Sequence, residues 1–137
     1  MSFQDAVRSC LQQRYTDFSG RSRRSEYWFF QLFAALAYLV WLVGLVVLGV
    51  SALRLIWSLI GVVVFVGLIV PAIAVFVRRL HDTGRSGWWW LLGLAPFGGI
   101  VLLVFTCLDS VPDNQYGPSP KGHTLPYPQM PPPIAPA

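Results

Sequence analysis

Long uncharged segments dominate the pattern of hydrophobic and polar positions along the chain. Three of them, residues 27–50, 55–77 and 88–108, contain no charged side chain. A bilayer core about 30 Å thick is crossed by about 20 helical residues, so each segment is long enough by itself. Each segment is also apolar on every face, which favours membrane spans over the buried helices of a soluble bundle. We therefore predict an all-α membrane protein with three transmembrane helices.

The two ends of the chain have a different character. Residues 2–15 place apolar side chains on one helical face and offer Ser2 as an N-cap. They predict an N-terminal amphipathic interfacial helix, which lies on the inner leaflet or packs on the protein's own cytoplasmic loop. Residues 122–137 are rich in proline, and we expect a disordered or polyproline tail there. The integral membrane domain is accordingly residues 1–121.

Prolines interrupt two of the three apolar segments. Pro71 lacks a backbone donor and clashes with the carbonyl of Gly67, so we predict a kink near Gly67. The third segment carries Pro96-Phe97-Gly98-Gly99 at its middle. This break indicates either a bent span, which we favour, or a re-entrant hairpin of two half-helices. The hairpin would leave the C-terminus in the cytoplasm.

Composition and charge fit a membrane protein and indicate its orientation. Of the 137 residues, 55% are hydrophobic and 12% are charged, against roughly 25% charged in a soluble domain. Eight arginines lie before the first span or between the second and third, whereas Arg54 and Lys121 lie elsewhere. The positive-inside rule then places the N-terminus and the second loop in the cytoplasm, and the first loop and the C-terminal tail outside. We expect no cleavable signal peptide, because the first apolar segment starts only at residue 27.

The remaining polar residues gather in three motifs. The candidate lipid- or partner-binding residues are Arg21, Arg24, Glu26, Arg78, Arg79, His81, Asp82, Arg85 and Trp88, and a C-terminal motif contains Asn114 and Tyr116. A basic flank beside an aromatic belt explains most of them without a binding site. His81 beside Asp82 permits a general-base hypothesis, but no nucleophile accompanies the pair. Two cysteines and two histidines without ligand spacing give no reason to expect a metal, a cofactor or a disulfide.

In this order and at this spacing, the motifs resemble a family of bacterial inner-membrane proteins, domain of unknown function 805, the YhaH-like proteins. The resemblance covers roughly residues 14–121 and rests on Phe18, Gly20-Arg21, Arg24, Glu26-Tyr27-Trp28, Pro71, Arg78-Arg79-Leu80-His81-Asp82, Gly84, Ser86-Gly87-Trp88-Trp89, Pro96, Gly99, Asn114, Tyr116-Gly117-Pro118 and Pro120. It implies a small multi-pass protein of the bacterial cytoplasmic membrane. It implies no biochemical activity.

We favour a non-enzymatic protein that binds anionic lipid, or a partner membrane protein, through an arginine-rich cytoplasmic face. We expect no nucleic-acid partner. Two alternatives stay open: an oligomeric transporter or channel subunit, and a membrane enzyme that uses His81 and Asp82. If the three motifs build one site, they must share one membrane face. Three full spans would instead place Asn114 and Tyr116 opposite the other two motifs.

Overall fold

The computed structural model describes residues 1–122, and every regular element in that range is a helix. In chain order the elements are α1 (Phe3–Arg8), the π-helical η1 (Ser9–Gln13), α2 (Arg24–Val47), α3 (Ala52–Asp82), the 3-10 helix η2 (Gly87–Leu94) and α4 (Gly98–Cys107). The all-helical fold class is confirmed. The expected Pro-rich tail lies, apart from Gly122, outside the described residues.

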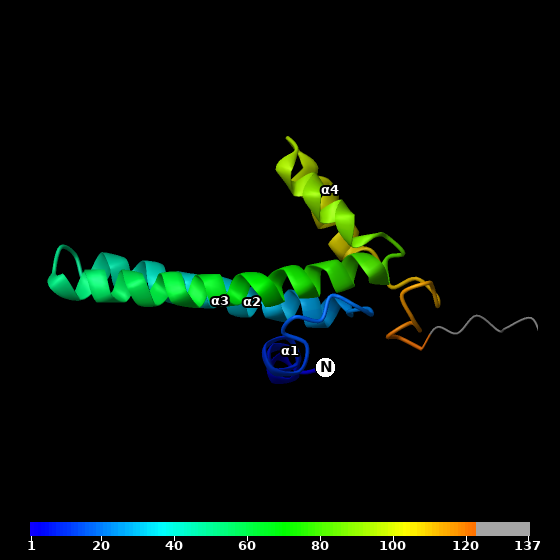
Figure 1. Ribbon diagram of the computed structural model, residues 1–137, viewed down its shortest axis with the longest axis horizontal. Helices are drawn as coiled ribbons and strands as arrows, with labels where there is room; N and C mark the ends of the chain where they lie inside the picture. The colour runs from blue at the N-terminus through cyan, green and yellow to red at the C-terminus, as the bar shows by residue number, and fades with distance from the viewer. Residues whose placement is uncertain (123–137) are drawn as a thin grey trace, which may run out of the picture.

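Helices α2 and α3 form a long antiparallel hairpin that runs along the longest axis of the molecule (Figure 1). They contain 24 and 31 residues, or about 36 Å and 46 Å of helix at about 1.5 Å per residue. Both are long and apolar enough to cross a membrane, as expected for the first two apolar segments.

Two tryptophan–glycine contacts bring α2 and α3 close together. A Cβ atom at Gly44 would lie 2.2 Å from the Trp57 ring, and one at Gly61 would lie 1.9 Å from the Trp41 ring. The Trp57 indole N–H also donates to the Trp41 carbonyl at 2.9 Å. Small residues let membrane helices approach in this way, and a larger side chain at either glycine would have to displace the tryptophan ring beside it.

Pro71 lies inside α3, where it leaves the Gly67 carbonyl without its usual helical partner. The Tyr15 hydroxyl donates to that carbonyl at 2.5 Å. The loop after η1 thus replaces a hydrogen bond that the proline removes. The sequence predicted the missing bond but not its replacement, and the kink itself stays a prediction.

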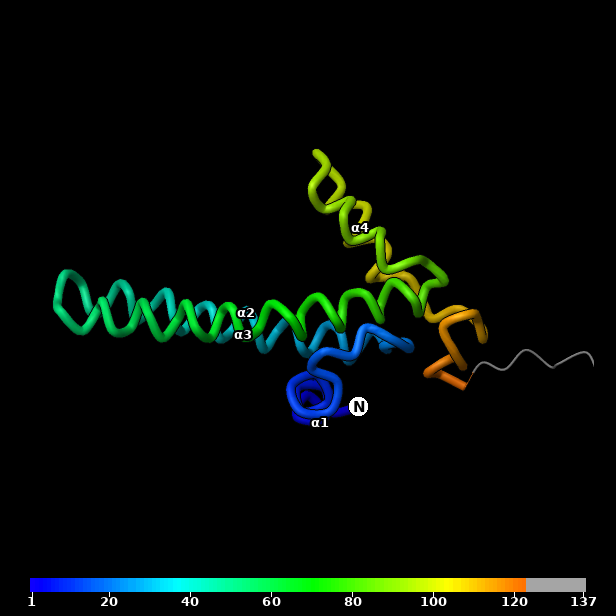
Figure 2. Tube along the Cα trace, viewed as in Figure 1, coloured from blue at the N-terminus to red at the C-terminus, as the bar shows by residue number. Residues whose placement is uncertain are grey.

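The third apolar segment folds back on itself instead of forming one helix (Figure 2). The rings of Trp89 and Phe105 pack edge to face with centroids 5.7 Å apart, and Gly93 lies beside Leu102, so η2 and α4 are antiparallel. The arms contain 8 and 10 residues, or about 15 Å each. The favoured prediction of a single bent third span was therefore wrong, and the described residues contain two helices of spanning length.

The turn between η2 and α4 explains why the segment reverses. Ala95 is extended, Pro96 cannot continue the first arm, and Phe97 takes a left-handed conformation at φ 64°. A Cβ atom at Gly98 would lie 1.7 Å from the Leu92 carbonyl oxygen, so only glycine permits this close approach. The break was visible in the sequence, but uncharged length alone cannot distinguish one span from two half-length arms.

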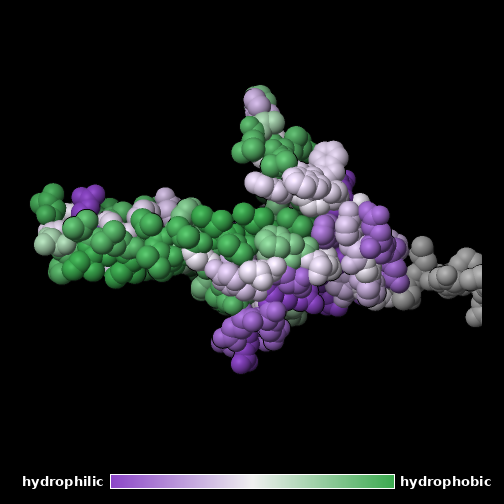
Figure 3. Space-filling view, in the orientation of Figure 1, coloured by the Kyte–Doolittle hydropathy of each residue, from purple (hydrophilic) through white to green (hydrophobic). Residues whose placement is uncertain are grey.

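The η2–α4 hairpin begins just after the C-terminal end of α3 and brings the chain back to that same end. Residues 108–121 accordingly lie beside residues 14–23, and the Val111 N–H donates to the Asp82 carbonyl at 3.1 Å. The three-span prediction placed Asn114 and Tyr116 at the opposite end of the molecule, and the structure contradicts it. Polar residues gather at this one end, while the long hairpin of α2 and α3 is apolar (Figure 3).

The N-terminal helix forms as the sequence predicted, over residues 3–13. Its N-cap is a capping box, in which the Ser2 hydroxyl accepts from the Asp5 N–H and the Asp5 carboxylate accepts from the Ser2 N–H, both at 3.1 Å. Ala6 and Cys10 are fully buried, and Phe3 meets Phe29 of α2 edge to face. The apolar face of this helix therefore packs against the base of α2.

The Tyr15→Phe substitution tests the bond to Gly67, because it removes only the hydroxyl. We expect the free energy of unfolding to fall by about 1 kcal/mol, the usual net value of one hydrogen bond. Equilibrium unfolding in mixed micelles measures it. Tyr38→Phe is the control, since Tyr38 is 51% exposed and its hydroxyl makes no hydrogen bond within residues 1–122. Equal losses in the two variants would contradict a specific role for Tyr15.

Candidate functional site

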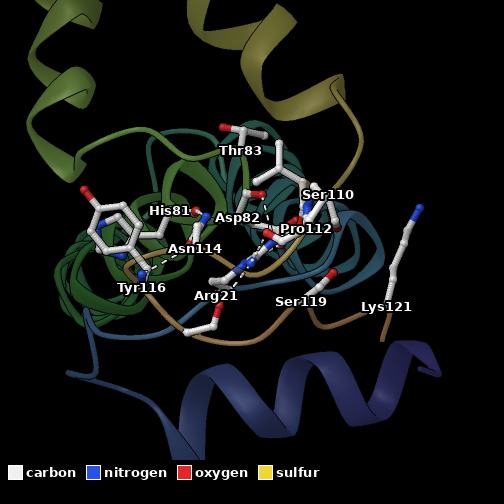
Figure 4. Close-up of polar contacts among 12 residues, drawn as sticks. Arg21, His81, Asp82, Thr83, Ser110, Pro112, Asn114, Tyr116, Ser119 and Lys121 are labelled. Atoms are coloured by element: carbon white, nitrogen blue, oxygen red, sulfur yellow. Dashed lines mark hydrogen bonds and ion pairs between the residues drawn. The ribbon is translucent and has the colours of Figure 1, made fainter. Parts of the chain in front are cut away.

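The three polar motifs of the sequence meet at the C-terminal end of α3 (Figure 4). We use the name polar cluster for the buried side chains found there, all less than one tenth exposed: Arg21, Ser22, Glu26, Arg78, Arg79, Asp82, Thr106 and Ser110. They come from the segment before α2, from α2, from α3, and from α4 and the segment after it. A buried charge without a partner costs several kcal/mol, so the pairing within the cluster determines its stability.

Asp82 lies at the centre of the polar cluster and is completely buried. Its carboxylate accepts from Arg21 Nε at 3.0 Å and from the Ser110 hydroxyl at 2.6 Å. It also forms an ion pair with Arg79, one helical turn earlier on α3. One carboxylate thus joins the segment before α2, the end of α3 and the segment after α4.

Arg21 uses its remaining donors to hold the C-terminal segment. Its Nη1 donates to the carbonyls of Pro112 at 2.9 Å and Gly117 at 3.1 Å. Its Nη2 donates to the Val111 carbonyl and, at 3.2 Å, to the backbone carbonyl of Asp82. A planar guanidinium presents five donors in a fixed geometry, which suits it to bind several carbonyls at once.

Arg78 joins α3 to the N-terminal half of the cluster. Its guanidinium is fully buried and donates to the Ser22 hydroxyl at 3.0 Å and the Asp17 carbonyl at 2.5 Å. It lies 3.6 Å from the Glu26 carboxylate, which also accepts from the Ser9 hydroxyl at 3.0 Å. The neighbouring Cys10 carries no charge near pH 7, because burial raises the pKa of its thiol to about 11.

Arg79 holds the end of α4. Its Nε donates to the Thr106 carbonyl at 3.2 Å, and its Nη2 donates to the Leu108 carbonyl. Cations that bind the last carbonyls of a helix satisfy groups that have no partner within that helix. The base of the η2–α4 hairpin is therefore fixed to α3 by the same arginine that pairs with Asp82.

His81 and Asp82 are adjacent in sequence but make separate contacts. The His81 ring stacks on Tyr116 with centroids 3.9 Å apart and planes 2° apart, and its Nδ1 lies 3.2 Å from the Gly20 carbonyl. The Asn114 amide donates to the His81 carbonyl at 2.9 Å. All three motifs therefore contribute to one network, and within residues 1–122 no hydrogen bond joins the His81 ring to Asp82.

The other residues singled out from the sequence lie nearer the surface. Arg24 reaches the Asp109 carboxylate at 3.3 Å, with side chains 42% and 57% exposed. Asp109 also pairs with Lys121, and mainly this hydrogen bond lowers the pKa of the Asp109 carboxyl to about 2. Arg85 stacks on the Phe105 ring at 3.8 Å. Trp88 is 76% exposed, as an interfacial aromatic residue would be.

A basic pocket of about 420 Å³ opens beside the polar cluster. It is lined by Met1, Asp5, Arg8, Ser9, Gln13, Arg14, Arg21, Arg23, Glu26 and Pro120. The two carboxylates are already bound, Asp5 in the capping box and Glu26 beside Arg78. The N-terminal part of the sequence offered no clear signal for this pocket, because the pocket depends on how α1 and η1 pack beside α2.

Three arginines of the basic pocket have little compensating charge. Arg23 makes no side-chain hydrogen bond or ion pair within the described part of the chain. Among residues 1–122, the Arg8 side chain donates only to the Gln12 side chain, at 3.1 Å. Arg14 is 43% exposed and lies 4.0 Å from Asp17, a distance at which an exposed ion pair contributes little. The pocket is therefore suited to an anionic group.

Sequence reasoning also missed part of the polar cluster itself. The Ser22 hydroxyl accepts from Arg78 and the Ser110 hydroxyl donates to Asp82, yet serines are common in every loop. Most other acceptors are backbone carbonyls, which every residue has. No group of three or more His, Cys, Asp or Glu side chains placed to hold a metal ion occurs among residues 1–122.

Comparison with known proteins identifies the family to which these motifs belong. The family model described as "Protein of unknown function (DUF805)" matches residues 15–118, which contain the whole polar cluster and both long helices. The chain belongs to this family. The resemblance drawn from the motifs is thereby confirmed.

Two relatives of the chain are named inner membrane proteins. Inner membrane protein YhaI of Escherichia coli (strain K12) is 40% identical over 111 residues, which cover 80% of this chain and 90% of the relative. Inner membrane protein YhaH of the same organism is 41% identical over 121 residues, covering 80% and 91%. By this homology the chain is an inner-membrane protein. No solved structure matches it.

The Asp82→Asn substitution tests the centre of the polar cluster. It keeps the shape of the side chain but leaves Arg21 and Arg79 buried without their counter-charge. We expect the free energy of unfolding to fall by about 3–5 kcal/mol, as it does when one partner of a buried ion pair is removed.

The matched control is Asp109→Asn, because Asp109 also has two cationic partners but lies at the surface. Exposed ion pairs contribute little, so this variant should unfold almost as the natural protein does. Thermal unfolding in detergent compares the two. Similar effects of both substitutions would contradict the central role of Asp82.

Proposed function

We propose that this DUF805 protein crosses the inner membrane twice, keeps both ends in the cytoplasm, and binds anionic lipid headgroups in its basic pocket. The observation that carries this proposal is the presence of three weakly paired arginines around a pocket at the end of the apolar hairpin. In this role the protein binds lipid and catalyses no reaction.

The distribution of charge supports the orientation. Of the ten basic residues, nine belong to the end that holds the polar cluster, and Arg54 alone lies near the turn between α2 and α3. Basic residues beside membrane spans are retained in the cytoplasm. With the η2–α4 hairpin entering and leaving on the same side, Lys121 is cytoplasmic as well. The first loop is then the only part of the described chain that is exposed on the outer side.

The location of the basic pocket supports a lipid as its ligand. The buried arginines Arg21, Arg78 and Arg79 are occupied by protein acceptors, so they are not the residues that meet lipid. Of the arginines that line the pocket, Arg8, Arg14 and Arg23 are the weakly paired ones, and they lie next to the start of α2, whose apolar surface begins within one turn. A cytoplasmic leaflet contains anionic headgroups at this level, and each juxtamembrane base attracts them by about 1 kcal/mol.

Reporter fusions test the orientation. A fluorescent protein that folds only in the cytoplasm should be bright when fused after Lys121, and an alkaline phosphatase that is active only outside should be active when inserted after Val50. An active phosphatase after Lys121 would mean that the third apolar segment crosses the membrane, and would overturn the two-span arrangement.

Lipid binding is tested by replacing Arg8, Arg14 and Arg23 with glutamine together. Native mass spectrometry of the full chain should detect preferential binding of phosphatidylglycerol over phosphatidylcholine. At about 1 kcal/mol for each base, the triple variant should lose about a hundredfold in affinity for phosphatidylglycerol.

The control for this experiment is Arg54→Gln, which removes a base at the other end of the molecule. It should leave the lipid preference unchanged. Thermal unfolding of each variant shows whether the fold is retained. A folded triple variant with an undiminished preference for phosphatidylglycerol would exclude the pocket as the lipid site.

A further inference from the structure

The two ends of the α2–α3 hairpin are surrounded by very different amounts of protein. At the end with the polar cluster, α1, η1, η2 and α4 all lie beside the long helices (Figures 1 and 2). At the other end the described chain contributes only the turn between α2 and α3, residues 48–51. In a bilayer this molecule therefore displaces more lipid from one leaflet than from the other.

The η2–α4 hairpin has the dimensions and polarity of an insertion into one leaflet. Its arms of about 15 Å are half as long as a hydrocarbon core of about 30 Å is thick, so the hairpin, which is inclined to α3, stays within one leaflet. Trp88 and Arg85 lie at its base, where interfacial residues belong. At its tip Leu94 and Phe97 are 79% and 82% exposed, as expected for side chains in contact with acyl chains.

The turn at the tip can lie in lipid because it supplies its own hydrogen bonds. The N–H of Ala95 donates to the Leu92 carbonyl, and the N–H of Gly98 donates to Ala95, both at 3.0 Å. Pro96 has no N–H that would need an acceptor. Irregular backbone is excluded from lipid where its polar groups are unpaired, and this turn leaves few of them unpaired.

The hairpin is held to the rest of the protein at its base alone. Gly87 packs against Val77, and Arg79 donates to the Thr106 carbonyl at 3.2 Å. Beyond these contacts the hairpin diverges from α3 (Figure 1). In the two-span placement proposed above, this wide end of the molecule extends into one leaflet.

We propose that the η2–α4 hairpin and α1 form a wedge in the cytoplasmic leaflet, so that the protein favours membrane whose cytoplasmic leaflet is on the convex side. Unequal insertion into the two leaflets makes membrane binding sensitive to curvature. This proposal rests on the two-span placement proposed above but not on the binding of anionic headgroups. It is therefore tested in vesicles of neutral lipid.

The experiment measures the orientation of the full chain in phosphatidylcholine vesicles of two sizes, small sonicated and large extruded. The variant Cys107→Ser with Gln115→Cys carries one reactive thiol on the exposed segment after α4, since Cys10 is buried. A thiol reagent that cannot cross the bilayer labels only molecules whose polar end faces outward. We expect the ratio of outward to inward molecules to be higher in small vesicles by about twofold or more.

A second substitution links this ratio to the hairpin. Leu94→Lys places a charge at the tip, which costs about 3 kcal/mol at the bilayer centre and should draw the hairpin out of the acyl layer. The dependence on vesicle size should then disappear. Val50→Lys is the control, because Val50 is 99% exposed in the turn at the narrow end, and it should keep the dependence.

The possible outcomes are distinct. Equal orientation ratios of the parent variant in small and large vesicles would overturn the wedge. So would an unchanged size dependence in Leu94→Lys. A reporter fused after Lys121 that is active on the outer side would overturn the two-span placement instead. The phosphatidylglycerol preference of the arginine variants tests the basic pocket and has no bearing on the wedge.

Discussion

The structure depends on the buried ion pairs of Asp82 with Arg21 and Arg79, which lie at one end of a long apolar hairpin. Charges taken out of water must find partners, because an unpaired buried charge costs several kcal/mol. Arg21 precedes the first long helix, and Asp82 and Arg79 end the second. Both arginines also donate to backbone carbonyls beyond α4. The need to satisfy these three charged groups therefore determines where three distant segments of the chain meet.

That requirement separates two roles that arginine has in this protein. From the sequence, all eight arginines of the polar end look alike, as a basic flank on the cytoplasmic side. In the structure Arg78 and Arg79 are completely buried and bind protein acceptors, whereas Arg23 is exposed beside an open pocket. The buried arginines organise the fold, and the exposed ones are available to a ligand. Substitutions in the first group are expected to act on stability, and those in the second on binding.

The parts of this fold that follow from local pattern could be predicted from the sequence, and the parts that follow from long-range contact could not. Uncharged length was sufficient for α2 and α3, and spacing was sufficient for the Ser2–Asp5 capping box. The third apolar segment was misjudged because hydropathy weighs length and ignores the space that Gly98 leaves for the Leu92 carbonyl. The bond from Tyr15 to Gly67, like those from Arg21 to backbone carbonyls, spans tens of residues and ends on a group that every residue carries. The sequence does not indicate which backbone carbonyl will accept such a hydrogen bond.

The reversal of the third segment and the shape of the whole molecule have the same origin. Because η2 and α4 turn back at Pro96, the chain brings Ser110 and Asn114 to the end of α3, where Asp82 and the His81 carbonyl bind them. The same reversal leaves two arms that are each too short to cross a bilayer, both at the polar end of the molecule. A full third span would have separated the C-terminal motif from the polar cluster and balanced the two leaflets. The turn at Pro96 thus both completes the polar cluster and widens one end of the protein. Substitutions that destabilise the cluster should therefore also weaken the contacts that hold the base of the η2–α4 hairpin to α3.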